Sequence, residues 1–213
     1  MSVLAKICGL STAETVAAAV QGGAAFTGFV FFPPSPRHLT PEQAGPLVSA
    51  VPTGITRVGV FVDPSDELLE KVLVKSPLDL LQLHGEETPE RAAAIKRRFG
   101  KKVMKAIKVA SEADLRRAPD YFAAVDWLMF DARPPKDATR PGGNALAFDW
   151  ELLHRRNWPL PWMLSGGLNA QNLGEAVRIS HATAVDVSSG VESRPGAKDG
   201  AKIREFLAQA KAI

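Results

Sequence analysis

Residues 26–61 read FTGFVFFPPSPRHLTPEQAGPLVSAVPTGITRVGVF, and this stretch holds one full repeat of the pattern that decides the fold. The apolar run at 29–32 predicts a strand buried on both faces, as in parallel sheets that are covered by helices. Residues 40–43, TPEQ, predict a capped helix start with proline at the first helical position. A second strand is predicted to begin near Thr56. The stretch is therefore a strand, a helix and the start of the next strand.

The same alternation of strand and helix runs through the whole chain. The candidate strands begin near Val3, Phe26, Thr56, Asp79, Lys102, Trp127, Leu160 and Ala184. Eight such units in 213 residues, with no linker rich in Pro, Gly or Ser, predict a single-domain (βα)8 barrel over residues 1–213, near minimal size. A doubly wound open sheet is the alternative, but it predicts a glycine-rich dinucleotide fingerprint after the first strand. Residues 6–9 read KICG instead.

The composition excludes several classes of protein. With 46% hydrophobic and 23% charged residues the chain is typical of a globular protein and not of a disordered one. A formal net charge of +3 is too small to indicate a nucleic-acid partner. The uncharged stretch 15–32 is interrupted by QGG at 21–23, which predicts a helix, a glycine stop and a strand, with no membrane span or signal peptide. Cys8 is the single cysteine, so we expect a cytoplasmic protein without an intrachain disulfide.

Two loops that contain glycine and serine follow the seventh and eighth candidate strands. Residues 164–168 read LSGGL, and residues 187–190 read VSSG. Loops in these two places of a (βα)8 barrel frequently bind phosphate, because glycines let backbone N–H groups approach an anion and serines add hydroxyl donors. Either loop alone is better explained as an ordinary turn. Together they predict a phosphate site formed by Gly166, Gly167, Ser188, Ser189 and Gly190.

Cys8 and Asp131 end the first and sixth candidate strands. A free cysteine usually packs as a small hydrophobic residue, but at a strand end it could act as a base if Lys6 also points into the barrel and lowers the thiol pKa. Asp131 could cap a helix or pair with Arg133, or it could be an acid among apolar neighbours. In a closed ring, strands 1 and 6 flank strands 8 and 7. The two residues would therefore bracket a bound phosphosugar, with a base on one side and an acid on the other.

Three further candidate residues lie at the same end of the predicted barrel. Arg37 follows a proline-stiffened segment, and its guanidinium suits a planar carboxylate, although most arginines lie exposed on the surface. Gln82 and His84 close the fourth strand, and His84 could be a base, a ring-stacking neighbour or a hydrogen-bonded strand-end residue. No His, Cys or Asp cluster has metal-ligand spacing and no P-loop is present, so we expect neither metal nor cofactor.

A series of short motifs follows in a fixed order along nearly the whole chain. They are KICG at 6–9, SPR at 35–37, VGVF at 58–61, QLHG at 82–85, Asp131, GG at 142–143, FDW at 148–150, LSGGL at 164–168, DVSSGVE at 186–192 and PGAKD at 195–199. Together these motifs closely resemble the phosphoribosylanthranilate isomerases of tryptophan biosynthesis. The ordered set is far more specific than any one of its members.

The resemblance implies a (βα)8 barrel that catalyses the Amadori rearrangement of N-(5'-phosphoribosyl)anthranilate to 1-(2-carboxyphenylamino)-1-deoxyribulose 5-phosphate without cofactor or metal. It implies that Cys8 is the general base at C2 and that Asp131 is the general acid at the furanose ring oxygen. Arg37 would bind the anthranilate carboxylate, and the glycine and serine loops would bind the phosphate. Gln82 and His84 are the remaining expected substrate contacts. The expected partner is a phosphorylated small molecule, and the expected state is a monomer or a homodimer.

One motif departs from the family pattern. The family usually has Gly-Gly-Thr-Gly after strand 6, whereas residues 142–145 read GGNA. Because the last glycine is lost, we expect Asn144 to keep a polar contact and Ala145 to adopt an αR or β conformation. Two alternatives stay open, another phosphosugar isomerase of the phosphate-binding barrel type and a non-catalytic phosphosugar-binding barrel. Examples of the first are a ribulose-phosphate epimerase, which would need metal ligands and paired acids, and a bifunctional sugar isomerase. The second alternative does not require both Cys8 and Asp131.

Overall fold

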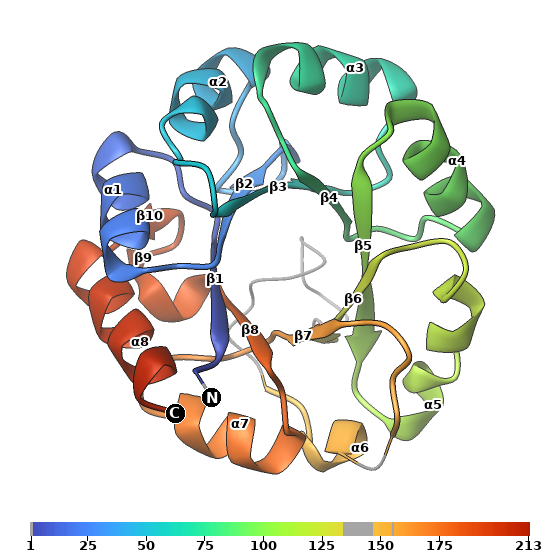
Figure 1. Ribbon diagram of the computed structural model, residues 1–213, viewed down its shortest axis with the longest axis vertical. Helices are drawn as coiled ribbons and strands as arrows, with labels where there is room; N and C mark the ends of the chain where they lie inside the picture. The colour runs from blue at the N-terminus through green and yellow to red at the C-terminus, as the bar shows by residue number, and fades with distance from the viewer. Residues whose placement is uncertain (1, 134–146, 155) are drawn as a thin grey trace.

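Parallel strands close into a barrel that is surrounded by helices (Figure 1). The computed structural model describes residues 2–133, 147–154 and 156–213. In this part of the chain the barrel strands are β1 (Leu4–Cys8), β2 (Phe26–Val30), β3 (Thr56–Phe61), β4 (Leu80–Leu83), β5 (Lys102–Val109), β6 (Trp127–Ala132), β7 (Trp162–Leu164) and β8 (Ala184–Val187). Each strand pairs with the next, and β8 pairs with β1, which closes the ring. The predicted (βα)8 barrel is therefore confirmed.

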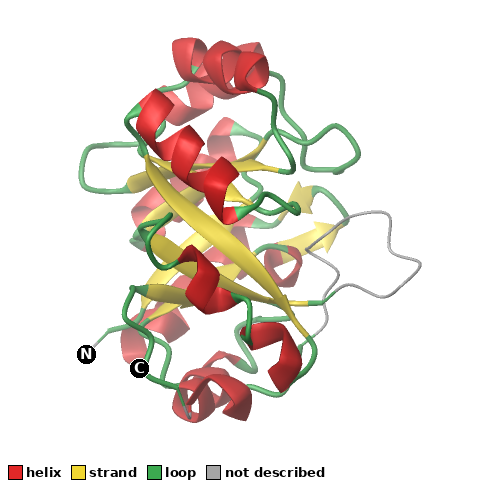
Figure 2. Ribbon diagram, turned by 90° about the vertical axis from the view of Figure 1, so that its right-hand side faces the viewer, coloured by secondary structure: helices red, strands yellow, loops and turns green. Residues whose placement is uncertain are grey.

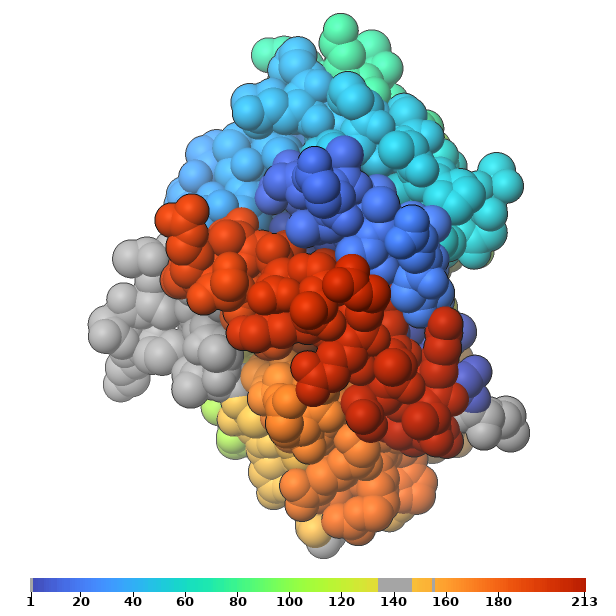
Figure 3. Space-filling model, turned by 90° about the vertical axis from the view of Figure 1, so that its left-hand side faces the viewer, coloured from blue at the N-terminus to red at the C-terminus, as the bar shows by residue number. Residues whose placement is uncertain are grey.

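The helices connect successive strands on the outside of the barrel. They are α1 (Ala13–Gly22), α2 (Pro41–Ser49), α3 (Asp66–Lys75), α4 (Pro89–Phe99), α5 (Glu112–Leu115), α6 (Glu151–His154), α7 (Leu173–Ser180) and α8 (Gly200–Ala212). Two 3-10 turns, η1 (Ala118–Tyr121) and η2 (Ser189–Val191), and a small antiparallel pair, β9 (Glu192–Arg194) and β10 (Ala197–Lys198), complete the described elements. Figure 3 shows α8, in red, lying against the blue N-terminal segments, which brings the two ends of the chain together.

Local sequence signals explain where several of these elements begin and end. The stretch 15–32 forms the predicted helix, stop and strand, because Gly23 ends α1 in the left-handed conformation at φ 81°. Thr40 caps α2 as predicted, with its hydroxyl accepting from the Gln43 N–H. No helix in the described residues is both long and apolar enough to cross a membrane.

The interior of the barrel is divided into an apolar floor and a polar upper layer. Side chains alternate along each strand, so every second residue points inward. The floor is an apolar cluster of Phe26, Val58, Leu80, Met104, Ala106, Met129, Met163 and Ala184. Figure 2 shows the helices, in red, around the yellow strands of the barrel. A larger cluster of buried apolar side chains comes from these strands and helices. The floor supports the polar residues above it, which lie at the carboxyl ends of the strands.

Candidate active site

The upper layer of the barrel interior, near the carboxyl ends of the strands, contains a group of buried polar side chains beside the apolar Val30 and Val60. Alternation along the strands and the parallel register place these side chains in one region. They are Lys6, Cys8, Gln82, His84, Asp131, Ser165 and Asp186. Active sites of this fold lie at this end of the barrel. The structure thus brings together Cys8, Gln82, His84 and Asp131, as expected from the sequence.

We call the end of the barrel at the carboxyl ends of the strands its mouth. Below Cys8, on the β1–β8 side of this mouth, lies a buried ion pair. Lys6 Nζ donates to Asp186 Oδ1 at 2.8 Å, and Ser165 Oγ donates to Asp186 Oδ2 at 3.0 Å. Lys6 is two residues before Cys8, and both side chains face Gly28 on β2. A Cβ at Gly28 would lie 3.1 Å from Cys8 Sγ and 3.2 Å from Lys6 Cε, so glycine leaves the room that both side chains need. Lys6 therefore does point into the barrel.

The Cys8 thiol lies in a largely apolar place with one cation beside it. Cys8 is buried and packs with Val30 and Val60. Burial raises the pKa of the Cys8 thiol above its ordinary value, although the Lys6 ammonium opposes this shift. Burial is the largest influence on the pKa of Lys6 and acts to lower it, but Asp186 and Cys8 together outweigh burial and the Lys6 pKa is raised. Lys6 is thus a permanent positive charge next to the thiol.

On the β4–β6 side of the mouth, Asp131 is hydrogen-bonded to His84, and His84 is hydrogen-bonded in turn to Gln82. His84 Nε2 lies 3.0 Å from Asp131 Oδ2, and Gln82 Nε2 lies 2.9 Å from His84 Nδ1. Gln82 Nε2 also donates to Met129 Sδ at 3.3 Å. The alternative partner suggested by the sequence, Arg133, is instead paired with Asp114. Asp131 therefore faces the barrel interior and does not form the surface ion pair.

Arg37 is buried at the mouth and has a carboxylate partner within the chain. Its Nε donates to Glu192 Oε1 at 2.6 Å, and its Nη2 donates to Glu192 Oε2 at 2.9 Å. Gly9, at φ 81°, makes room for the arginine, because a Cβ there would lie 2.5 Å from Arg37 Cδ. Arg37 is therefore no exposed surface arginine, and its guanidinium is fixed in one orientation.

Lys198 connects this arginine pair to the end of β8. Its Nζ donates to Glu192 Oε1 at 2.8 Å and to Ser188 O at 2.8 Å. Burial lowers the pKa of the Lys198 ammonium to about 8, although the Glu192 carboxylate opposes this shift. Burial acts to raise the pKa of Glu192, but Arg37 and Lys198 outweigh it and the pKa lies below its ordinary value. The cluster Arg37–Glu192–Lys198 thus carries a net positive charge near neutral pH.

The loops after β7 and β8 are held against each other and against the ends of β6 and β1. Gly166 and Gly167 have φ angles of 95° and 66°, and a Cβ on Gly166 would lie 2.6 Å from the backbone N of Ala132. A Cβ on Gly190 would lie 2.0 Å from Leu168 O, so only glycine fits between the two loops. Ser188 Oγ donates to the carbonyl of Cys8 at 3.2 Å. The loops are therefore compact and adjacent to both Cys8 and Asp131.

Several residues of this region are not predicted by sequence reasoning. Asp186 gives a signal, because it is a carboxylate inside the otherwise apolar strand AVDV. Glu192 and Lys198 lie in the motifs DVSSGVE and PGAKD, but neither motif reveals that both side chains meet Arg37. Ser165 gives no signal apart from its place before two glycines.

Parts of the prediction fall outside this geometry. Residues 142–145, with Asn144 and Ala145, lie outside the described residues. Within the described ranges, no three or more His, Cys, Asp or Glu side chains form a group that could hold a metal ion.

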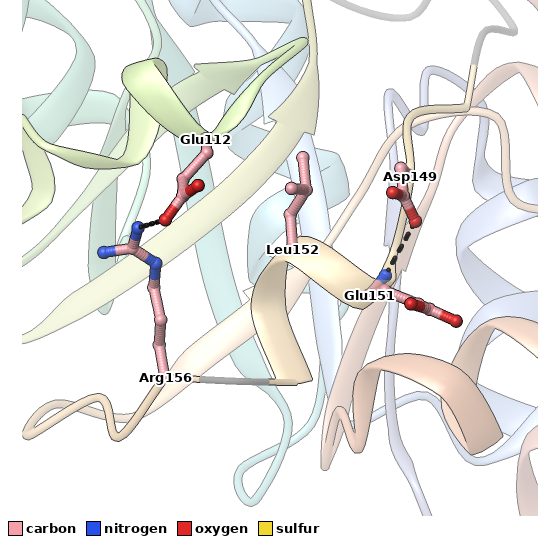
Figure 4. A pocket seen from close by; sticks show the side chains of 5 residues that line it. All are labelled: Glu112, Asp149, Glu151, Leu152 and Arg156. Carbon is pink, nitrogen blue, oxygen red and sulfur yellow. Dashed lines mark hydrogen bonds and ion pairs between the residues drawn. The ribbon is translucent and has the colours of Figure 1, made fainter.

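A cavity of about 420 Å³ is lined by residues outside the predicted site. Figure 4 shows its lining: Glu112, Asp149, Glu151, Leu152 and Arg156.

Comparison with known proteins agrees with this arrangement at the level of the family. The family model for N-(5'-phosphoribosyl)anthranilate (PRA) isomerase matches residues 5–209. The chain belongs to this family. The N-(5'-phosphoribosyl)anthranilate isomerase of Rhodospirillum centenum is 59% identical to this chain over 214 residues. The alignment covers 100% of each of the two chains. The corresponding protein of Paramagnetospirillum magneticum is 55% identical and covers 99% of this chain and 98% of its own length.

Solved PRA isomerase structures have the same fold. The enzyme from Thermotoga maritima superposes with a TM-score of 0.87 at 37% identity and covers 99% of this chain and 100% of its own. Another structure, a complex with reduced 1-(o-carboxyphenylamino)-1-deoxyribulose 5-phosphate, has a TM-score of 0.84 at 36% identity with the same coverage. The expectation of an isomerase of tryptophan biosynthesis is confirmed by this family membership.

Proposed function

We propose that this chain catalyses the Amadori rearrangement of N-(5'-phosphoribosyl)anthranilate, with Cys8 as general base and Asp131 as general acid. The observation that supports this assignment is the position of the two groups. Both face the barrel interior at the carboxyl ends of β1 and β6, and these strands flank the β7 and β8 loops in the closed ring. A sugar whose phosphate is bound by those loops has one reactive group on each side.

The first chemical step uses the β6 side of the mouth. Protonated Asp131 gives its proton to the furanose ring oxygen. The bond from that oxygen to C1 breaks, its electron pair stays on the oxygen, and the nitrogen lone pair forms a C=N bond. The products are an open-chain hydroxyl, a protonated Schiff base and the Asp131 carboxylate, which can accept the His84 N–H 3.0 Å away.

The second step uses the β1 side. The Cys8 thiolate removes the proton at C2 of the Schiff base, and the electron pair of the C–H bond moves into the C1–C2 bond. The C=N electrons return to nitrogen, which gives a neutral enolamine and a neutral thiol. Protonation at C1 and loss of the C2 hydroxyl proton then give the ketone. Lys6 supports the thiolate electrostatically, because its ammonium is beside Cys8 and is held there by Asp186.

The two anionic groups of the substrate need separate cationic or N–H-rich places. We assign the phosphate to Gly166, Gly167, Ser188, Ser189 and Gly190, next to the start of η2. We assign the anthranilate carboxylate to Arg37, because Glu192 fixes the guanidinium through Nε and Nη2 and leaves the Nη1 amino group. His84 contacts the substrate in this proposal, whereas Gln82, which is 1% exposed, acts through His84.

The direct test is a fluorescence assay of freshly prepared substrate with Cys8→Ala and Asp131→Asn. Each variant is expected to lose on the order of 10² to 10⁴ in kcat, which is the usual contribution of a general acid or base. Unchanged circular dichroism and melting temperature would show that both variants remain folded. Turnover near the wild-type rate in either folded variant contradicts the role assigned to that residue.

We further propose that the protein acts in the cytoplasm, as a monomer or homodimer, and without a nucleic-acid or membrane partner. The weak net charge of +3 supports the first exclusion, because it gives little attraction for nucleic acid. Light scattering coupled to gel filtration measures the oligomeric state. A larger assembly, or co-elution with nucleic acid, would contradict the proposal.

A further inference from the structure

We propose that Gln82 is a positioning residue that holds the ring proton of His84 on Nε2, so that His84 always donates a hydrogen bond to Asp131. This inference rests on the proposed function only in that Asp131 is the acid. The position of the proton on His84 follows from contacts within the chain. It can therefore be measured without substrate.

The distances determine the direction of each hydrogen bond. Gln82 Nε2 is an amide nitrogen, which can only donate, and it lies 2.9 Å from His84 Nδ1. His84 Nδ1 must therefore accept and carries no proton. The proton of the neutral ring is then on Nε2, which lies 3.0 Å from Asp131 Oδ2. The chain of bonds runs in one direction, from the Gln82 amide through His84 to the Asp131 carboxyl group.

Met129 explains why the Gln82 amide takes this orientation. With the amide as it stands, Nε2 donates both to His84 Nδ1 and to Met129 Sδ at 3.3 Å, and Oε1 is a buried atom without a hydrogen bond among the described residues. Turning the amide by 180° would place Oε1 against the sulfur and would leave the NH₂ group without a partner. Buried unpaired N–H groups are rarer than under-satisfied carbonyl oxygens. The sulfur on β6 thus selects the amide orientation, and the amide selects the tautomer.

The consequence for the reaction is that each oxygen of Asp131 has its own task. Because His84 Nε2–H donates to Oδ2, the proton that goes to the ring oxygen is carried on Oδ1. When that proton leaves, the negative charge forms on a carboxylate that already has a donor in place. No proton moves between His84 and Asp131 in this step, and His84 stays neutral. With the opposite tautomer, the lone pair of Nε2 would face the new carboxylate and repel it.

The test is a long-range ¹H–¹⁵N correlation spectrum of the unliganded protein with ¹⁵N-labelled histidine. The chain has four histidines, and loss of one set of signals in His84→Asn identifies the set of His84. We expect the His84 Nδ1 signal in the unprotonated range and the Nε2 signal in the protonated range near neutral pH. A ring protonated on Nδ1, or on both nitrogens, overturns the proposal.

Two variants test whether Gln82 is the cause. Gln82→Glu has nearly the same shape but replaces the donor by an acceptor, so it should draw the His84 proton to Nδ1 or give a doubly protonated ring. Gln82→Met has no hydrogen-bonding group and should give a mixture of tautomers. An unchanged His84 spectrum in both variants overturns the role of Gln82. Met129→Leu, which keeps the volume but removes the sulfur, should also weaken the preference, and serves if a Gln82 variant fails to fold.

Kinetics then link the tautomer to the reaction. In Gln82→Glu we expect kcat to fall on the order of 10-fold, a part of what a general acid is worth, while KM changes little. A changed tautomer with unchanged kcat overturns the positioning role. If Asp131→Asn proves active while His84 is held as the Nε2–H form, the assignment of Asp131 fails and the tautomer assignment stands. The two failures are therefore distinguishable.

Discussion

Cys8 and Asp131, the proposed base and acid, have different surroundings on the two sides of the barrel mouth. On the β1–β8 side, Cys8 lies above the ion pair of Lys6 and Asp186. On the β4–β6 side, Asp131 is hydrogen-bonded to His84 and through it to Gln82, a pair that carries no charge in the tautomer proposed above. A thiol that must lose its proton benefits from a fixed cation, whereas a cation beside a carboxyl group would keep it ionised and unable to act as an acid. The comparison shows that each environment suits the opposite direction of proton transfer.

The first prediction concerns the loss of the ion pair between Lys6 and Asp186 on the β1–β8 side. Lys6→Met leaves the buried Asp186 carboxylate without its cation, so the free energy of unfolding should fall by about 3 to 5 kcal/mol. The double variant Lys6→Met/Asp186→Asn removes both charges and should regain most of that loss. Urea unfolding of the three proteins measures the difference. Equal losses in the single and double variants would show that the ion pair is not what stabilises this side.

The second prediction concerns Lys198, which pairs with Glu192, and the way its burial makes the free energy of unfolding depend on pH. Its pKa is about 8 in the folded chain and 10.5 as the ordinary value, so the unfolded chain binds more protons between these pH values. The penalty for burying the ammonium is therefore relieved as the pH rises. Relative to Lys198→Met, the wild-type protein should gain up to about 3 kcal/mol in unfolding free energy across this window. A relative loss instead would mean that Glu192 raises the Lys198 pKa.

The third prediction separates binding from chemistry at the arginine. Arg37→Lys keeps a positive charge but loses the fork that Glu192 orients, so KM should rise on the order of 10-fold, about 1.4 kcal/mol, with a smaller change in kcat. Steady-state kinetics with the purified variant measure both constants. Arg57→Lys is the matched control, because Arg57 is held by Asp79 through Nε and Nη2 in the same way but lies at the start of β3, at the other end of the barrel. An unchanged KM in Arg37→Lys would contradict carboxylate binding at this position.

The fourth prediction concerns the loss of the Gln82 hydrogen bond to His84 on the β4–β6 side. Of the four substitutions, this one should change the free energy least. Gln82→Met removes the donor to His84 Nδ1, but it also removes the unpaired Oε1, so the free energy of unfolding should fall by only about 1 kcal/mol. Compared with Lys6→Met in the same urea experiment, this loss should be several-fold smaller. A loss as large as that of Lys6→Met would mean that the two sides do not differ in the way described.

The sequence predicts what depends on neighbouring residues and misses what depends on distant ones. Strand starts, the Thr40 cap and the inward direction of Cys8 and Asp131 follow from local pattern and alternation. The ion pair of Lys6 joins residues 180 positions apart, and that of Arg37 joins residues 155 positions apart. No local pattern carries such pairings, because they arise when the ring closes. For the same reason the sequence predicts Arg37 as a binding residue but not the carboxylate that orients it.

In the proposed mechanism the acid and the base act in separate steps on opposite sides of the mouth. Single-turnover kinetics with substrate carrying deuterium at C2 test it most directly, on the residual rates of Cys8→Ser and Asp131→Asn. Proton removal should limit the first variant, which then shows a large isotope effect. Ring opening should limit the second, whose isotope effect should be close to one. Equal isotope effects in the two variants would contradict the division of labour between Cys8 and Asp131.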